Sequence, residues 1–224
     1  MDRFRHMVRL GRHVVLQLRN IFEAINVQEV NNLTDAMAKR EYHYTADLPT
    51  TPDPSIGTVL VTGASGYIGG RLIPELLSRG YRVRIMVRGQ SPEYREMWPS
   101  AEVVDADARD TDDLRAALRG VHTAYYLIHS LLLGQREFEA ADLRAAVSIR
   151  RMAEEAGLKR IIYLGGLGDA RAKLSSHLRS RIRVAEELAR GKVPVTILRA
   201  AIIIGSGSTS YEIINHLVKR VIIL

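Results

Sequence analysis

A histidine and an arginine stand four residues apart in the stretch 174–188, LSSHLRSRIRVAEEL, which has the pattern of a helix with a Ser-rich start. Residues at this spacing share one helix face, so His177 and Arg181 are expected to be neighbours. An imidazole titrates near neutral pH and can donate a proton, and a nearby guanidinium can hold a ribose or phosphate and lower the pKa of the imidazole. The pair predicts either an acid–base site or a polar face that only lines a nucleotide pocket.

A glycine-rich turn carries the strongest motif of the chain. VTGASGYIGG has the pattern G-x-x-G-x-x-G between an apolar run and a helical segment. Glycines in this context permit a tight turn and a close approach of the backbone to a pyrophosphate, which then lies at the helix N-terminus. The motif predicts a dinucleotide site formed by Gly63, Ser65, Gly66, Tyr67, Ile68 and Gly69.

Cofactor preference depends on the end of the second apolar segment, where the adenine ribose is recognised. An acid at this place would accept hydrogen bonds from the ribose hydroxyls of NAD, but the chain has Arg88 in IMVRGQ and no acid before Glu93. Since an arginine can pair with a 2′-phosphate, the sequence favours NADP, with NAD as the alternative. Arg88 could instead stack on adenine or point to solvent.

Apolar and amphipathic segments alternate from Thr58 onward, in the order that builds βαβ units. Such alternation predicts an α/β Rossmann fold, with a doubly wound parallel sheet between two layers of helices. Helices are expected at 67–80, 111–120, 135–156 and 174–188, with a short segment at 91–98, and strands at 58–63, 81–87, 101–107, 122–128, 160–166 and 194–204.

The composition sets the class of protein. With 224 residues, 46% hydrophobic and 25% charged, the chain is typical of a soluble globular protein. It has no cysteine and its seven histidines are scattered, so we predict no metal site. No apolar run approaches the ~20 residues of a membrane span, and no signal-peptide pattern begins the chain, so we expect a cytoplasmic location.

The net charge of +7 is unevenly placed. Residues 1–56 contain seven basic and seven acidic side chains, and the excess lies beyond them, notably in 171–199. This basic region lacks interleaved aromatic residues and any nucleic-acid motif. It favours an anionic small-molecule substrate, or a solvated basic face, and we expect no nucleic-acid partner.

The chain divides into three predicted parts. Residues 1–46 form a basic amphipathic helical extension, residues 47–57 a Pro-rich linker, and residues 58–224 the dinucleotide-binding domain. The extension could lie on a membrane or a protein partner, although packing on its own domain, or no fixed structure, is the more ordinary expectation.

Five segments together resemble a known family: VTGASGYIGG, VVDADARD, YLGGLGD, SSHLRSR and PVTILRAAIIIGSGS. They are similar to atypical short-chain dehydrogenase/reductases of the extended, NAD(P)H-binding, epimerase/dehydratase-like type. The bacterial members that carry an additional C-terminal domain are the nearest in pattern. The resemblance covers Thr58 to Lys219 and implies an NAD(P)-dependent oxidoreductase.

The resemblance also implies roles for residues at the ends of the later strands. Asp107 and Ala108 match positions that contact adenine, Ile128 and His129 lie beside the ribose and nicotinamide, and Leu164 and Gly165 line the nicotinamide pocket. These positions are carboxyl ends of predicted strands, where ligands bind in open α/β sheets. His129 is a second candidate acid–base group, or a residue that packs against the cofactor.

The chain departs from the family at its catalytic residues. Where typical members have Ser, Tyr and Lys, this sequence has Gly165 or Gly166, His177 and Arg181. The sequence also lacks most of a substrate-binding lobe after the sixth strand, so that lobe is missing or truncated. We therefore predict an NADP-preferring oxidoreductase with non-standard acid–base residues, or alternatively a non-catalytic NAD(P)H-binding sensor or assembly factor.

Other polar and aromatic residues have plain structural explanations. Tyr125, Tyr126 and Tyr163 lie inside predicted strands and are expected in the core. Asp169 follows a strand and is expected to form a turn.

Overall fold

A computed structural model describes residues 48–89, 92–128, 137–168, 175–205, 207–208, 211–212 and 214–216. The chain forms two compact units, one comprising residues 38–201 and the other residues 1–37 with 202–224. His129 and Asp169 lie outside the described residues, as does the predicted helical extension.

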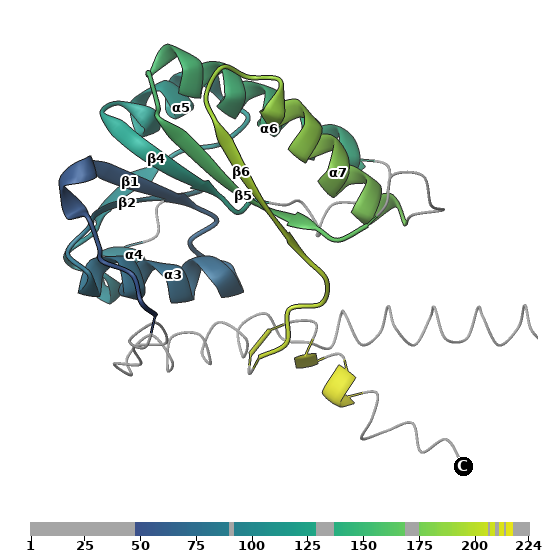
Figure 1. The fold of residues 1–224 in the computed structure, drawn as a ribbon, viewed down its shortest axis with the longest axis horizontal. Helices are drawn as coiled ribbons and strands as arrows, with labels where there is room; N and C mark the ends of the chain where they lie inside the picture. Colours follow the sequence, from purple (N-terminus) through teal and green to yellow (C-terminus); the bar gives the residue numbers. More distant parts are fainter. Residues whose placement is uncertain are drawn as a thin grey trace, which may run out of the picture. The chain divides into compact units, whose positions relative to one another are not determined.

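Within the described residues the first of these units contains a six-stranded parallel sheet in the order β3-β2-β1-β4-β5-β6 (Figure 1). The strand order reverses direction between β1 and β4, which is the topological switch point of a doubly wound sheet. The predicted Rossmann fold is therefore confirmed. The strands are β1 (Thr58–Thr62), β2 (Arg82–Val87), β3 (Glu102–Asp105), β4 (Val121–Tyr126), β5 (Arg160–Gly166) and β6 (Val195–Ala200).

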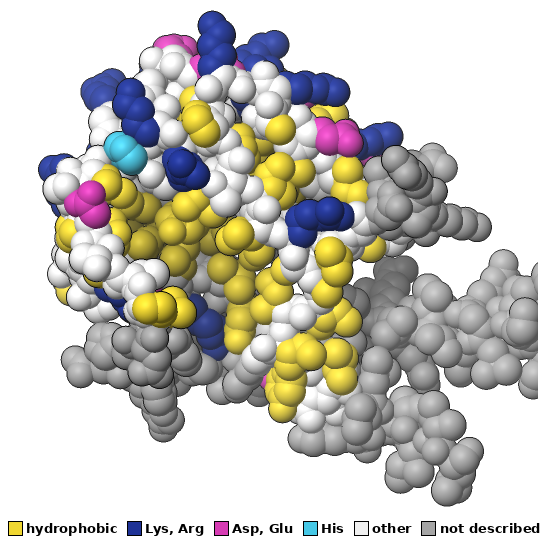
Figure 2. Space-filling model, in the orientation of Figure 1, with side chains coloured by type: hydrophobic (Ala, Val, Ile, Leu, Met, Phe, Trp, Pro, Cys, Tyr) yellow, Lys and Arg dark blue, Asp and Glu magenta, His cyan; other side chains and the backbone are white. Residues whose placement is uncertain are grey.

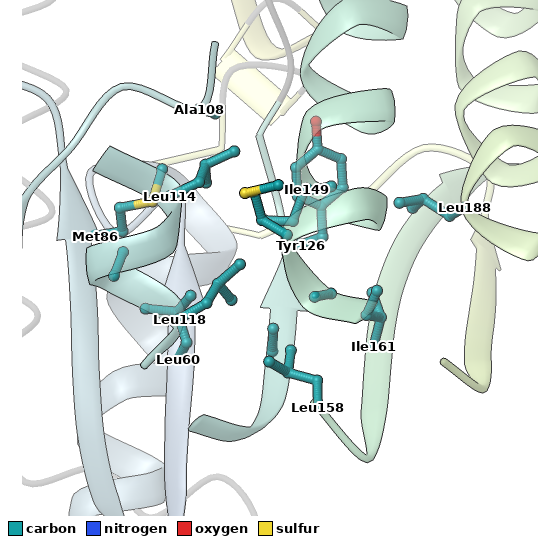
Figure 3. Close-up of a cluster of buried hydrophobic side chains, with 14 of the residues drawn as sticks. Leu60, Met86, Ala108, Leu114, Leu118, Tyr126, Ile149, Leu158, Ile161 and Leu188 are labelled. Carbon is teal, nitrogen blue, oxygen red and sulfur yellow. The ribbon is translucent and has the colours of Figure 1, made fainter. Parts of the chain in front are cut away.

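Helices cover both faces of this sheet (Figure 1). Two core clusters separate the layers, since alternate residues of a strand point to opposite faces. Leu60 of β1 packs in the cluster with α5, α6 and α7 (Figure 3), while Val59 and Val61 pack in the cluster with α3 and α4. The helices are α3 (Tyr67–Ser78), α4 (Glu93–Met97), α5 (Thr111–Leu118), α6 (Glu137–Glu155) and α7 (Ser176–Ala189).

The start of α5 agrees with the sequence prediction and the end of β6 differs from it. Asp110 is the N-cap of α5, because its carboxylate accepts from the N–H groups of Asp112 and Asp113. The predicted sixth strand continued to residue 204, but β6 ends at Ala200. A run of apolar residues alone did not distinguish a paired strand from the segment that follows it.

The last part of the predicted linker contacts the domain. Pro54–Ile56 form a 3-10 turn, η1, capped by Asp53, whose own N–H donates to the hydroxyl of Tyr81 at 3.0 Å. In the other unit, Ser208 ties its local turn together, accepting from the N–H of Tyr211 and donating to the carbonyl of Ile203. No helix in the described part of the chain combines the length and apolarity needed to cross a membrane.

Candidate nucleotide site

The carboxyl ends of β1 and β4 are tied together at the switch point. The Thr62 hydroxyl donates to the carbonyl of Tyr125 and accepts from the N–H of Leu127, both at 3.1 Å. Thr62 is fully buried, so this link is protected from water. It fixes the position at which the glycine turn leaves the sheet.

The glycine turn requires glycine at its first and third positions. Gly63 has a φ of +68°, and a Cβ there would lie 3.0 Å from the carbonyl oxygen of Leu127. At Gly69 a Cβ would lie 2.3 Å from the carbonyl oxygen of Gly63, far inside van der Waals contact. The two glycines thus let α3 begin directly against β1, as a pyrophosphate-binding turn requires.

Backbone N–H groups at the start of α3 are available to an anion. Gly66 is the N-cap and no side chain caps the helix. Ser65 and Gly66 are exposed, and Tyr67 and Ile68 are half-buried. Arg71 brings a cation to the same turn: its guanidinium carbon lies 3.6 Å from the Tyr67 ring centroid and it donates to the Tyr67 carbonyl. Uncapped N–H groups, the helix dipole and this cation suit a pyrophosphate.

The end of β2 presents Arg88 on a fixed loop. Arg88 is exposed, and the next residue, Gly89, has a φ of +86° and donates its N–H to Oδ1 of Asp105 at 2.7 Å. Asp105 ends β3, the neighbouring strand. An acid does therefore approach the end of β2, but it is engaged by the backbone, and the side chain presented there is a cation.

The loop after β3 carries an ion pair. Asp107 accepts from Arg109 through both carboxylate oxygens, the shortest contact being 2.6 Å. Chiefly through this hydrogen bond, Arg109 lowers the pKa of Asp107 to about 2, and the charge of Arg88 acts in the same direction. Ala108, the other predicted adenine contact, is buried.

The ends of β4 and β5 hold the remaining predicted cofactor residues. Ile128 follows β4 and is half-buried, packing against the core cluster under α6. Leu164 and Gly165 lie at the carboxyl end of β5. The fold thus brings the described cofactor candidates to one edge of the sheet, the edge where the resemblance placed them.

The predicted acid–base helix is observed as α7, but its two polar residues differ in exposure. Ser175 caps α7 by accepting from the N–H of Leu178 at 3.3 Å. His177 lies in the first turn and is half-buried. Arg181 is only 8% exposed; it donates to the carbonyl of Leu164 and lies 5.1 Å from the Tyr163 ring centroid. Its guanidinium is therefore hydrogen-bonded to β5 within the fold.

Space for the missing family serine is occupied. A Cβ at Gly166 would lie 3.0 Å from Cδ2 of Leu178 and 3.5 Å from Cβ of Arg181, and one at Gly165 would lie 3.1 Å from Cε1 of Tyr163. At Gly166 the neighbouring side chains belong to α7, and a serine there would require Leu178 to shift by a few tenths of an ångström.

The buried tyrosines do not replace the family tyrosine. Tyr126 is 1% exposed and Tyr163 is fully buried, which confirms that they are core residues, and Tyr125 is half-buried. Burial raises the pKa of Tyr163 to about 12 and raises the pKa of Tyr126 further. Neither phenol is suited to proton transfer near neutral pH.

A cavity of about 740 Å³ lies at the carboxyl end of β5, between α7 and β6. Its walls are the end of β5, one face of α7 and the edge strand β6, including Gly165, Arg181, Ile182, Ile197 and Arg199. Hydrophobic side chains also gather over the middle of the face seen in Figure 2, and Leu198 of β6 is 51% exposed. The cavity shares Gly165 with the predicted nicotinamide end.

Part of the predicted basic region is paired with acidic side chains of the same chain. Arg179 and Arg183 of α7 both approach Glu139 of α6, and Arg190 pairs with Glu187 at 2.9 Å. These contacts leave less free positive charge for an anionic substrate than the sequence suggests. No group of three or more acidic or histidine side chains that could hold a metal is found in the described ranges.

Sequence reasoning missed Thr62, Arg71, Asp105 and Arg109. Arg109 stands two residues after the predicted adenine contact, in VVDADARD, so its position was a signal for it. The roles of Thr62 and Asp105 depend on contacts between neighbouring strands, and no local sequence pattern predicts such contacts.

Comparison with known proteins identifies the family. Residues 63–220 match the family described as NAD(P)H-binding. The chain belongs to this family. It is an atypical short-chain dehydrogenase/reductase, as the sequence motifs predicted, and the glycine turn and α3 fit the dinucleotide that such proteins bind.

Curated relatives and solved structures agree with this assignment. Sterol demethylase protein B of Methylococcus capsulatus is 36% identical over 118 residues, covering 50% of this chain and 35% of that protein. A 3 beta-hydroxysteroid dehydrogenase/Delta 5-->4-isomerase of Mycobacterium tuberculosis is 32% identical over 118 residues, covering 48% and 31%. The structure of MoeE5 in complex with UDP-glucose and NAD covers 74% of this chain and 61% of its own, with a TM-score of 0.61 and 20% identity, which shows the shared fold. The matches to both curated relatives span about a third of those proteins.

Proposed function

We propose that the chain is an NADP-preferring, NAD(P)H-binding oxidoreductase with non-standard acid–base residues. The observation that carries the preference is the end of β2, where Arg88 is exposed and the nearby Asp105 is held by the N–H of Gly89. An acid free to bind ribose hydroxyls favours NAD, whereas a free arginine favours a 2′-phosphate.

In this proposal the dinucleotide lies along the carboxyl edge of the sheet. The N–H groups at the start of α3 hold the pyrophosphate, with Arg71 beside them, and Asp107 and Ala108 meet the adenine. Ile128 lies beside the ribose and nicotinamide, and Leu164 and Gly165 form the nicotinamide pocket. The uncapped helix N-terminus and the close glycine packing support this arrangement.

His177 is the proposed proton donor for a carbonyl substrate, and the bound nucleotide supplies the hydride. His177 lies in the first turn of α7, half-buried, and imidazole is suited to proton transfer near neutral pH. Arg181 has a positioning role, because its guanidinium holds the Leu164 carbonyl at the end of β5. The names of the two curated relatives, a sterol demethylase protein and a hydroxysteroid dehydrogenase, support redox chemistry.

A second candidate is a nucleotide-binding sensor or assembly factor without turnover. The packing of Leu178 and Arg181 against Gly166 favours it, because this packing occupies the room of the family serine. In this case the bound nucleotide would stabilise a surface that a partner recognises.

Binding titrations test the cofactor proposal. We expect NADPH to bind wild-type protein about tenfold more tightly than NADH, the effect of one charge-assisted contact, and Arg88→Ala to remove the difference. Arg95→Ala is the matched control, since Arg95 is exposed on the next helix, α4. Equal wild-type affinities would contradict the preference.

Turnover separates the two candidate functions. NADPH oxidation is followed by absorbance with a panel of ketone and aldehyde substrates, for wild type and His177→Phe. We expect turnover that His177→Phe lowers about a hundredfold, which is typical for a general acid. Unchanged turnover in the variant removes His177 from the mechanism, and tight NADPH binding without turnover on any substrate favours the sensor.

A further inference from the structure

The loops that follow β2 and β3 are held side by side. Val87 is paired with Asp105 in the sheet, the N–H of Ala106 donates to the Val87 carbonyl at 2.9 Å, and Asp105 accepts from Gly89. Arg88 and Asp107 extend from these loops, and the charge of Arg88 is close enough to act on the Asp107 carboxylate. A ligand that reaches Arg88 therefore also approaches Asp107 and its partner Arg109.

Arg109 occupies the carboxylate that the adenine would use. Nε of Arg109 lies 3.0 Å from Oδ1 of Asp107 and Nη2 lies 2.6 Å from Oδ2, while the Arg109 N–H also donates to Oδ1. Asp107 thus has both oxygens engaged by one residue. If Asp107 is to accept from the adenine amino group, Arg109 has to give way at least in part.

The Asp107–Arg109 ion pair is exposed enough for Arg109 to exchange Asp107 for another anion. The side chain of Arg109 is 54% exposed and that of Asp107 is 27% exposed. Exposed ion pairs add little net stability, so replacing the partner of Arg109 costs little. A phosphate monoester carries about −1.5 to −2 charges near neutral pH, against −1 for the carboxylate, and therefore competes well for a guanidinium.

We propose that Arg109 is a specificity-determining residue that leaves Asp107 to pair with the 2′-phosphate beside Arg88, so that Asp107 becomes free to accept from the adenine amino group. The inference rests on the proposed function, since it needs the nucleotide at this edge of the sheet. In the free protein the Asp107 carboxylate pairs with Arg109 in place of the phosphate, and this pairing holds Arg109 at the site.

The exchange predicts opposite effects for the two members of the pair. Removing Arg109 should weaken recognition of the 2′-phosphate and leave Asp107 free to accept from the adenine amino group. Removing the charge of Asp107 should release Arg109 in advance and increase the preference for a 2′-phosphate, even where adenine binding itself becomes weaker. If the pair only stabilises the loop, removing either member would change the affinities for ligands with and without a 2′-phosphate by the same factor.

Isothermal titration of the full chain with adenosine 2′,5′-bisphosphate and adenosine 5′-monophosphate tests this exchange. For Arg109→Gln we expect the ratio of bisphosphate to monophosphate affinity to fall about tenfold, the usual loss for one charge-assisted contact, while the monophosphate binds at least as tightly as to wild type because Asp107 is free. For Asp107→Asn we expect a larger ratio of bisphosphate to monophosphate affinity than in wild type. Arg115→Gln is the matched control, because Arg115 is similarly exposed and paired with Asp112 and Glu155.

The failures of the two proposals are distinguishable. If wild type binds both probes and Arg109→Gln changes the two affinities by the same factor, or Asp107→Asn lowers their ratio, the exchange is wrong and the nucleotide site stands. If wild type binds neither probe nor NADPH, the nucleotide site is wrong, and the role of Arg109 with it.

Discussion

The polar groups at the two halves of the carboxyl edge of the sheet differ in exposure and in hydrogen bonding. Near β1 and β2, the start of α3 has no side-chain cap and Arg88 is exposed. At β5 and α7, Arg181 is 8% exposed and donates to the Leu164 carbonyl. Glycines serve both halves, but at Gly69 the glycine lets the backbone pack closely, while at Gly166 side chains fill the space.

The two halves therefore differ in what they are suited to: the first to binding a nucleotide, and the second to packing within the fold. The half near β1 has the closely packed glycine turn and the uncapped start of α3, which suit a pyrophosphate. In the half near α7, the Arg181 guanidinium and the space beside Gly166 are taken up by contacts within the protein. A family that usually performs hydride transfer can therefore retain its nucleotide site where its usual Ser, Tyr and Lys have all been replaced.

The largest expected effect is that of Gly69→Ala. The new Cβ would lie 2.3 Å from the Gly63 carbonyl oxygen, which belongs to the backbone and cannot move aside. We expect a loss of about 3 kcal/mol in the free energy of unfolding, the upper part of the usual range for overpacking, together with loss of NADPH binding. Denaturant unfolding and NADPH titration measure the two effects.

Gly166→Ala is the matched control in the other half. Its Cβ would meet Cδ2 of Leu178 at 3.0 Å, the far end of a flexible side chain. We expect a cost of about 1 kcal/mol and unchanged NADPH affinity. If Gly166→Ala abolished NADPH binding and Gly69→Ala did not, the assignment of the two halves would be reversed.

Arg181→Met should destabilise the fold with little effect on the nucleotide. The change leaves the Leu164 carbonyl without its guanidinium donor in a largely buried place, which typically costs about 2 kcal/mol. Thermal or denaturant unfolding gives the cost, and NADPH titration gives the affinity. A large loss of affinity with unchanged stability would instead place the guanidinium on the ligand.

Ser175→Ala should remove the cap of α7. The Ser175 hydroxyl accepts from the N–H of Leu178, and loss of such a cap costs about 1 kcal/mol. Ser175→Asp keeps an acceptor at the N-cap and should retain the stability of wild type. Equal destabilisation by both variants would show that the cap contributes nothing.

The smallest expected effect is the acid dependence of the Asp107–Arg109 pair. The pKa of Asp107 is lowered from 3.8 to about 2 in the fold, so its stabilisation is complete above the unfolded value and is lost as the pH falls toward the folded value. Because the pair is exposed, we expect less than about 1 kcal/mol. Asp107→Asn should therefore be less stable than wild type at neutral pH and match it near pH 2, as measured by denaturant titration. A difference that grows toward low pH would contradict this.

The sequence predicted the parts of the molecule that depend on local pattern. The alternation of apolar segments gave the parallel sheet, and G-x-x-G-x-x-G gave the turn at Gly63, because each follows from backbone geometry. The candidate cofactor residues that the structure describes gather at one edge, since carboxyl ends of parallel strands meet there.

The remaining features depend on which partners three-dimensional packing supplies. Arg181 was expected to face a ligand, but whether a guanidinium reaches a ligand or a carbonyl of β5 depends on the distance between α7 and the sheet. Arg109 was passed over, because its contact with Asp107 is a side-chain choice within a loop. The end of β6 was missed, since Ile202 and Ile204 continue the apolar pattern while remaining 62% and 67% exposed.

Hydrogen–deuterium exchange with and without NADPH tests the central comparison most directly. The account predicts slower exchange in peptides that contain Gly63–Gly69 and in those around Arg88 and Asp107. Peptides from the far walls of the cavity, around Ala189 and Ile197, should exchange at an unchanged rate. Protection confined to the cavity walls, with none at the glycine turn, would contradict the account.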